Sequence, residues 1–243
     1  MKYKETIPTA GLQSFIHSFW ELTGEANDRQ WERIFPDGCP GVVVNMGASC
    51  PTDSGALVMD QGRTYVVGSA KNFKESFVEE RTHLVGVCLK PGAFSHFFTY
   101  ADQREIADKT VLLERSNSLK TALLHKEPYS YLNRFFLERL SPQDGFLQTV
   151  LNDIQQAGAV VRVGELAKRN HVTIRQLERY FSRYVGMTPK EYINIVRFQR
   201  ALQALQQPER KSLSEIAFLS GYYDQAHLTN EVKRLTGNNP SEF

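Results

Sequence analysis

The stretch LSEIAFLSGYYDQAHLTNEVKRLTGNNPSEF, residues 213–243, is the segment from which the rest of the chain is interpreted. Its first half repeats apolar residues at helical spacing and stops at Gly221, which predicts one short helix. A second helix is predicted directly after it, because Asp224 stands at the N-cap position and Gly237 follows the last apolar repeat. Two short helices joined by a tight turn containing glycine are typical of DNA-binding helix-turn-helix units.

The same plan occurs about fifty residues upstream, in VGELAKRNHVTIRQLERYFSRYVGMTPKEY, residues 163–192. Residues 165–167 match 215–217, and residues 186–192 match 237–243. The second copy has one extra residue in its turn. An internal repeat this regular indicates a duplicated supersecondary unit.

Between the copies, residues 191–205 carry an apolar stripe at helical spacing, which predicts a connecting helix. A helix of this length would hold the two units at a fixed separation. Two recognition helices held in this way can enter major-groove segments about one helical turn, roughly 34 Å, apart. One chain is therefore expected to read a two-part DNA site.

This arrangement, with ERYF in the first unit and GYYDQAHLTNEVKRLTG in the second, resembles the AraC/XylS family of bacterial transcription regulators from about residue 158 to the end. The resemblance implies a sequence-specific regulator of transcription whose partners are double-stranded DNA and RNA polymerase. The side chains expected to contact DNA are Arg175, Gln176, Arg179, Arg183, Gln225, His227, Asn230, Lys233 and Arg234.

The residue types suggest different roles for these side chains. Arg175 and Arg179 are long cations four residues apart on one helix face, which suits bidentate contacts with guanine, and the alternative for Arg175 is a contact with a phosphate. Gln225 suits adenine, whereas His227 can contact bases or only the DNA backbone. The region is also the more basic one. From residue 157 onward there are 13 Lys and Arg against eight Asp and Glu, whereas the first 156 residues hold 16 against 19.

Residues 1 to about 100 predict mainly short strands, separated by turn sequences such as PDGCPG. The expected strands are 15–22, 33–35, 41–46, 64–68 and 83–90, and PGAFSHFF from Pro91 is expected to start a helix. The segments FPDGC and VGVCLKPGAF resemble the cupin-like N-terminal domain of a group of AraC-type regulators. The prediction is therefore an α+β chain with a β-rich, cupin-like barrel or sandwich, a helical middle and an all-α C-terminal domain.

In relatives such an N-terminal domain senses a small molecule or mediates dimerisation. We expect a small-molecule effector or a partner protein to act there. The aromatic residues that can line an apolar effector pocket, or alternatively fill the barrel, are Trp20, Trp31, Phe35 and Tyr65.

The chain is expected to divide into residues 1–110 as the sensor, 111–157 as a helical linker or dimerisation region, and 158–243 as the DNA-binding domain. Leu-rich stripes within 116–156 can pair with a second copy of the chain in a homodimer or pack on the barrel. Residues 157–159 are the expected linker.

The sequence predicts no metal site, cofactor or catalytic constellation. The cysteines Cys39, Cys50 and Cys88 and the scattered histidines lack the spacing of metal ligands. No apolar run approaches the roughly 20 residues that span a bilayer, and the N-terminus lacks the apolar segment of a signal peptide, so no membrane contact and a cytoplasmic location are expected. Two alternatives stay open: a cupin-like metal enzyme fused to a DNA-binding module, and a ligand-free regulator whose N-terminal domain binds a protein.

Overall fold

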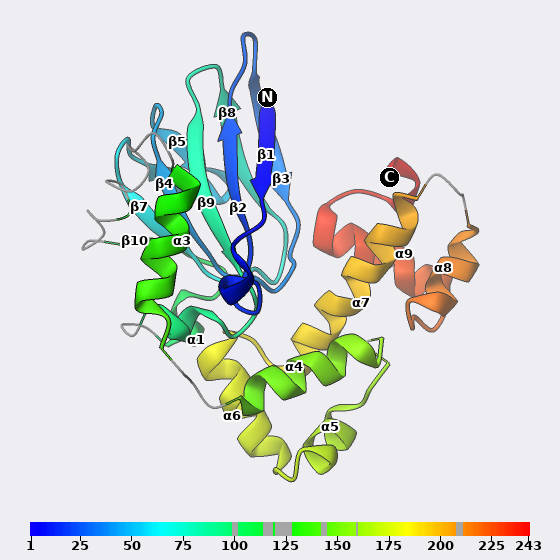
Figure 1. Cartoon of the computed structure of the whole chain (residues 1–243). Helices are drawn as coiled ribbons and strands as arrows, with labels where there is room; N and C mark the ends of the chain where they lie inside the picture. The colour runs from blue at the N-terminus through cyan, green and yellow to red at the C-terminus, as the bar shows by residue number, and fades with distance from the viewer. Residues whose placement is uncertain (99–101, 114–118, 120–127, 142–144, 159, 208–210) are drawn as a thin grey trace.

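The structure is a computed structural model of the chain and describes all residues except 99–101, 114–118, 120–127, 142–144, 159 and 208–210. Its strands lie together in one part of the molecule, and the helices from α4 (Phe146–Gln156) to α9 (Gln225–Thr236) lie in the other (Figure 1). The chain is a mixed α and β protein with a β-rich N-terminal region and a helical C-terminal region, as the sequence predicts.

Six strands form one antiparallel sheet in the order β1-β2-β9-β4-β7-β10, while β3 pairs with β8 and β5 with β6. We call these strands and the turns that connect them the β region. Their bounds are β1 (Lys2–Thr6), β2 (Ile16–Thr23), β3 (Arg29–Ile34), β4 (Gly41–Asn45), β5 (Cys50–Thr52), β6 (Leu57–Met59), β7 (Thr64–Val67), β8 (Lys74–Glu79), β9 (His83–Leu89) and β10 (Thr110–Leu112).

Side chains alternate between two cores across the large sheet, as the period of a strand requires. Val42 and Val44 of β4 join the core that also contains Phe136, whereas Val43 between them joins a smaller core with Tyr65. Because the central strands are covered on both faces, their sequences read as continuous apolar runs.

The five expected strands correspond to β2, β3, β4, β7 and β9. Strands β1 and β10 were not expected because they are short strands at the two edges of the sheet, where few side chains are buried. Strands β5, β6 and β8 were also not expected. The helix expected from Pro91 is wrong. Gly92 turns the chain with φ of +76°, and only a 3-10 turn, Phe94–His96, follows.

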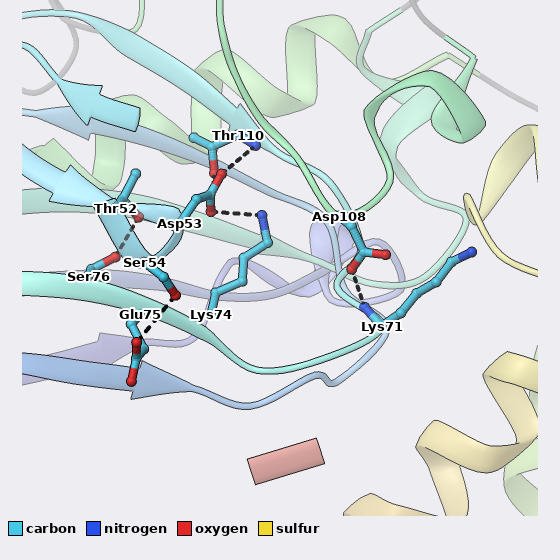
Figure 2. Close-up of polar contacts among 9 residues, drawn as sticks. All are labelled: Thr52, Asp53, Ser54, Lys71, Lys74, Glu75, Ser76, Asp108 and Thr110. Carbon is cyan, nitrogen blue, oxygen red and sulfur yellow. Dashed lines mark hydrogen bonds and ion pairs between the residues drawn. The ribbon is translucent and has the colours of Figure 1, made fainter. Parts of the chain in front are cut away.

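A partly buried polar network anchors an edge of the β region (Figure 2). The carboxylate of Asp53 accepts a hydrogen bond from Lys74 Nζ at 2.9 Å and two from the backbone N–H and hydroxyl of Thr110, each at 3.1 Å. The backbone N–H of Lys71 donates to Asp108 at 2.6 Å, while the Lys71 side chain extends away from the network. These bonds tie β8 and β10 to the turn that carries Asp53.

The helices after residue 127 correspond to the expected segments, whereas the short helix at residues 103–106 was not expected. Their bounds are α1 (Gln103–Ile106), α3 (Pro128–Arg139), α4 (Phe146–Gln156), α5 (Val163–Arg169), α6 (Ile174–Tyr184), α7 (Pro189–Leu205), α8 (Leu213–Leu219) and α9 (Gln225–Thr236). None of the helices in the described part of the chain combines the length and apolar character needed to cross a membrane.

The apolar stripes of the helical middle are buried within this chain. Helix α3 packs on the large sheet through Leu132, Phe135 and Phe136. Helix α4 instead shares a core with α5, α6 and α7 through Leu147, Val150, Leu151 and Ile154. Leu119 is buried against the sheet, and the rest of the segment 116–127 lies outside the described residues.

Helix α7 joins two separate cores and lies between the two short helix pairs (Figure 1). Its first half contributes Tyr192, Ile193, Ile195 and Val196 to the core around α5 and α6. Its second half contributes Phe198, Ala201 and Leu202 to the core around α8 and α9. The two pairs are therefore mounted on one continuous helix.

Candidate nucleic-acid interface

The first helix pair presents α6 with a buried face and a polar face. Leu177 and Phe181 are fully buried, whereas Arg175, Arg179 and Arg183 are exposed. The 3.6-residue period of the helix produces this division. The helix begins at a capping box in which Thr173 Oγ1 accepts from the N–H of Gln176 at 3.1 Å.

Gln176, expected at the DNA, is exposed but also caps its own helix. Its Oε1 accepts hydrogen bonds from the backbone N–H of Thr173 at 2.9 Å and from its hydroxyl at 3.0 Å. A base contact by Gln176 would therefore use its NH₂ group or give up the capping box.

A groove of about 990 Å³ runs along the polar face of α6. Arg175, Arg179 and Arg183 line it from α6, and Asp102 and Arg104 line it from the start of α1. Helix α1 also approaches the end of α6 closely, since a side chain on Gly186 would lie 2.8 Å from a backbone oxygen of α1. The face of α6 that carries the arginines thus lies next to α1, which belongs to neither helix pair.

The second helix pair presents α9 in the same way. Leu228 and Val232 are fully buried, while the exposed side chains include Gln225, His227, Asn230, Lys233 and Arg234. Asp224 is the N-cap, as expected, and accepts from the N–H of His227 at 2.7 Å. Gly221 turns the chain before α9 with φ of +78°, a conformation that glycine adopts without a steric cost.

Two predicted contact residues on α9 already have neighbours. Ser214 donates a hydrogen bond to Gln225 Oε1 at 3.3 Å, and the ring of His227 meets Tyr222 edge-on with centroids 5.2 Å apart. Both contacts join α8 or the turn to α9. They orient these side chains at the start of the recognition helix.

Arg234 is held more firmly than the other predicted contact residues. Its guanidinium donates two hydrogen bonds to Glu231, at 2.9 and 3.2 Å, and one to Asn72 of the β region at 3.1 Å. The hydrogen bonds to Glu231 raise the pKa of Arg234. Glu231 therefore pairs within its own helix, and Arg234 connects α9 to the β region.

Arg33, at the end of β3, makes a second connection to this helix pair. Its Nη1 donates to the carbonyl of Thr236 at 3.3 Å and to the side chain of Asn238. Beside it, the ring of Phe35 meets Phe243 edge-on with centroids 5.8 Å apart.

Helix α7 is attached to the β region as well. Gln199 Nε2 donates to the carbonyl of Pro36 at 2.6 Å, and Lys71 forms an ion pair with Glu191 at 3.1 Å. We call the contacts of Arg33, Lys71, Gln199 and Arg234 the docking contacts. Together they hold the β region against α7 and the second helix pair.

The four aromatic residues considered for an effector pocket lie in three separate places. Trp20 and Tyr65 belong to the small core on one face of the sheet, and Trp31 is 44% exposed beside Phe77. Phe35 packs on the C-terminal residue. None of the four lines the cavities described here.

A cavity of about 560 Å³ lies between the β region, α4 and α6. Its aromatic and apolar lining includes Phe15, Leu147, Tyr180 and Tyr184, and His96 adds a polar group. Nδ1 of His96 lies 2.8 Å from a backbone carbonyl oxygen, which can only accept, so Nδ1 donates this hydrogen bond and Nε2 is left for a ligand. Sequence reasoning missed this cavity because segments far apart in the chain build it.

Residues 157–159, expected to be the linker, follow α4 directly. Gly158 has φ of +71°, and a side chain there would collide with Arg200 of α7. The junction between α4 and α5 is therefore packed against α7.

Two family models match this chain, one near each end. The model of a helix-turn-helix domain matches residues 166–243, and that of a domain of unknown function (DUF6597) matches residues 4–112. The Msm operon regulatory protein of Streptococcus mutans is 26% identical over 139 residues, which are 55% of this chain and 50% of that protein. The transcriptional activator RhaS of Pectobacterium carotovorum is 32% identical over 83 residues, 34% of this chain and 29% of that protein.

The chain thus spans half or less of the length of these curated relatives. Among solved structures, ToxT from Vibrio cholerae covers 100% of this chain and 97% of its own, with a TM-score of 0.57 and 9% identity. A second ToxT structure, bound to (E)-4-(8-methylnaphthalen-1-yl)but-3-enoic acid, covers 100% and 98% with a TM-score of 0.54 and 10% identity. At such identities the likeness concerns the fold alone. Residues 166–243 match a helix-turn-helix domain, and the relatives that match the chain are regulators of transcription, in agreement with its resemblance to the AraC/XylS family.

Proposed function

We propose that this protein is a sequence-specific DNA-binding regulator of transcription whose two helix pairs both act as helix-turn-helix units. The observation that carries this proposal is the mounting of α6 and α9 on the single helix α7, each with an apolar face buried and a polar face exposed. A rigid spacer of this kind suits two recognition helices that enter successive major-groove segments. We further propose a cupin-like β region. The division into residues 1–110, 111–157 and 158–243 stays a prediction, and we propose that α4 belongs with the last of these parts because it shares its core.

The exposed residues divide into two groups by chemistry. The arginines and lysine on α6 and α9 can neutralise phosphates, which supplies affinity that falls as salt rises. Arg179, Gln225 and Asn230 can form hydrogen bonds with base edges, which supplies sequence choice.

The experiment selects binding sites for the full chain from a random DNA pool and footprints the selected site at two salt concentrations. We expect two protected patches about one helical turn apart, with affinity that falls steeply in salt. A single protected patch would contradict the two-unit proposal. Failure to enrich any sequence, with or without effector, would contradict DNA recognition itself.

The proposed effector is a small molecule with an aromatic or apolar body and one polar group, bound in the cavity between the β region, α4 and α6. The lining supports this, since Phe15, Tyr180 and Tyr184 offer ring surfaces and His96 offers a hydrogen-bonding nitrogen. An aromatic carboxylic acid is the compound bound in one ToxT structure. A ligand here would touch the recognition helix α6 directly.

A test of the effector site measures thermal stabilisation by a panel of aromatic and aliphatic carboxylic acids. An acid that binds only the folded chain at 100 times its Kd adds about 2.7 kcal/mol. Tyr184→Ala should abolish the shift of any acid that stabilises the wild type, whereas Trp31→Ala, which changes an aromatic residue elsewhere, should retain it. Equal shifts in both variants would place the ligand in another site.

The docking contacts provide a way for a ligand to change DNA binding. They hold α7 and α9 against the β region, and α1 borders the arginine face of α6. A ligand that favours another placement of the β region would shift the population of chains able to bind DNA. RNA polymerase contact and a homodimer belong to the same proposal. A homodimer would use a surface other than the buried stripes of α3 and α4.

A further inference from the structure

Three side chains with metal-binding atoms meet beside the large sheet, although their spacing in the sequence does not suggest a site. They are Asp37, Cys39 and Cys88, and their ligand atoms all lie within 4.8 Å of one another. Cys88 Sγ lies 3.9 Å from Asp37 Oδ2. The strands bring them together, because Cys88 on β9 pairs with Gly41, two residues after Cys39.

The turn before β4 holds two of these groups in place. The backbone N–H of Cys39 donates to Asp37 Oδ1 at 2.8 Å, and Gly38 between them has φ of +77°. A side chain on Gly38 would lie 3.0 Å from the ring of Tyr192 on α7. The turn is therefore tightly folded against α7.

The cluster opens into a cavity of about 440 Å³ between the β region, α4 and α7. Asp37 and Cys39 line this cavity together with His17, Lys90 and Tyr192. A ligand bound at the cluster would be reached from the cavity and would lie between the parts of the chain that the docking contacts join.

We propose that Asp37, Cys39 and Cys88 bind a thiophilic divalent metal ion such as Zn²⁺. Two thiolates and one carboxylate are ligands that zinc accepts, and three protein ligands leave a fourth position open to the cavity. Zinc bonds of about 2.3 Å to sulfur and 2.0 Å to oxygen in a tetrahedron separate sulfur from oxygen by roughly 3.5 Å. The observed 3.9 Å between Cys88 Sγ and Asp37 Oδ2 requires only a small side-chain movement.

Charge and protons balance at such a site. Both thiols lose their protons to solvent when the metal binds, so two thiolates, one carboxylate and a divalent ion together carry one negative charge. Lys90 lines the same cavity and supplies a positive charge nearby. This proposal does not depend on DNA binding.

The position of the site suggests what the metal would control. The turn that carries Asp37 and Cys39 also receives the hydrogen bond from Gln199 of α7 at Pro36. Metal binding would stiffen this turn and so change how α7 is held by the β region. This regulatory step rests on the proposed function, whereas metal binding itself is measured without DNA.

The experiment titrates the metal-free, reduced full chain with Co²⁺, which replaces Zn²⁺ and shows its thiolate ligands by an ultraviolet charge-transfer band. We expect a band that saturates at one Co²⁺ per chain and disappears when Zn²⁺ is added. Cys39→Ser and Cys88→Ser should each lose the band, and Asp37→Asn should weaken Co²⁺ binding. Cys50→Ser is the matched control, because Cys50 is a buried thiol outside the cluster that donates a hydrogen bond to the carbonyl of Phe77. The Cys50→Ser variant should keep the band.

Circular dichroism of each variant separates loss of metal from loss of fold. The proposal is overturned if reduced wild-type protein develops no thiolate band at stoichiometric Co²⁺, or if folded Cys50→Ser loses the band as Cys39→Ser does. It is equally overturned if Cys39 and Cys88 form a disulfide in air and the reduced protein binds no metal.

Discussion

Replacing Arg179 by alanine tests the proposed recognition surface most directly. Arg179 is exposed on α6 and makes no hydrogen bond or ion pair with any described residue. The substitution therefore removes no contact that stabilises the fold, and the free energy of unfolding should change by less than about 0.5 kcal/mol. A bidentate contact with guanine contributes about 1–3 kcal/mol of discrimination, so affinity for the selected site should fall roughly 5- to 150-fold.

The assay is fluorescence anisotropy with the selected duplex and a scrambled duplex of equal length, each at two salt concentrations. The loss should appear on the selected duplex and be small on the scrambled one. Arg63→Ala is the control, since it makes the same change on an exposed residue of the β region and should leave both affinities unchanged. An equal loss on both duplexes would make Arg179 a phosphate contact, and no loss would refute its place at the DNA.

Four further perturbations follow from the packing. Arg33→Ala should weaken the docking contacts and raise the affinity for DNA by up to about fivefold, because a partly exposed charged hydrogen bond contributes about 1 kcal/mol. An unchanged affinity would mean that the docking contacts do not restrain DNA binding. Thr188→Ala removes the N-cap of α7 and should lower the free energy of unfolding by about 1 kcal/mol in urea denaturation. An unchanged midpoint of the urea transition would contradict this. A fragment of residues 145–243 should unfold cooperatively, whereas a fragment of residues 158–243 should not, because it lacks α4 and therefore part of the core that α4 shares with α5, α6 and α7. Equal stability of the two fragments would contradict this role of α4. Burial raises the pKa of Glu191, but hydrogen bonds from Thr188 and the ion pair with Lys71 together lower it more, so the net pKa lies below its ordinary value. The carboxylate should therefore stabilise the fold above about pH 4.5 and lose this effect as pH falls, and Glu191→Gln should reduce that acid-dependent loss in urea unfolding.

The helical C-terminal region could be predicted in detail because its signals are local. The start of α9 is marked by Asp224, and the start of α7 by Thr188 with Glu191 three residues later. Helix periodicity separated the buried Leu177 from the exposed Arg179. Each of these features depends on residues within one or two helical turns.

The β region was predicted only in part, because a strand depends on partners elsewhere in the chain. Strand β8 is stabilised by β3, some forty residues earlier, and the edge strand β10 by β7. Edge strands bury few side chains and so lack the apolar pattern that marks a central strand. Pairing with a neighbouring strand is therefore what makes these segments strands.

Short stretches of sequence are enough to predict the repeated helix pairs, the helix between them and the polar faces that suit DNA, because helix caps and periodicity act over a few residues. Contacts between distant parts of the chain place α4 in the C-terminal core, join Arg234 to Asn72 by a hydrogen bond, and bring Cys39 and Cys88 together. Each of these arrangements depends on which distant surfaces bury one another, and the short-range pattern of a sequence does not specify that choice.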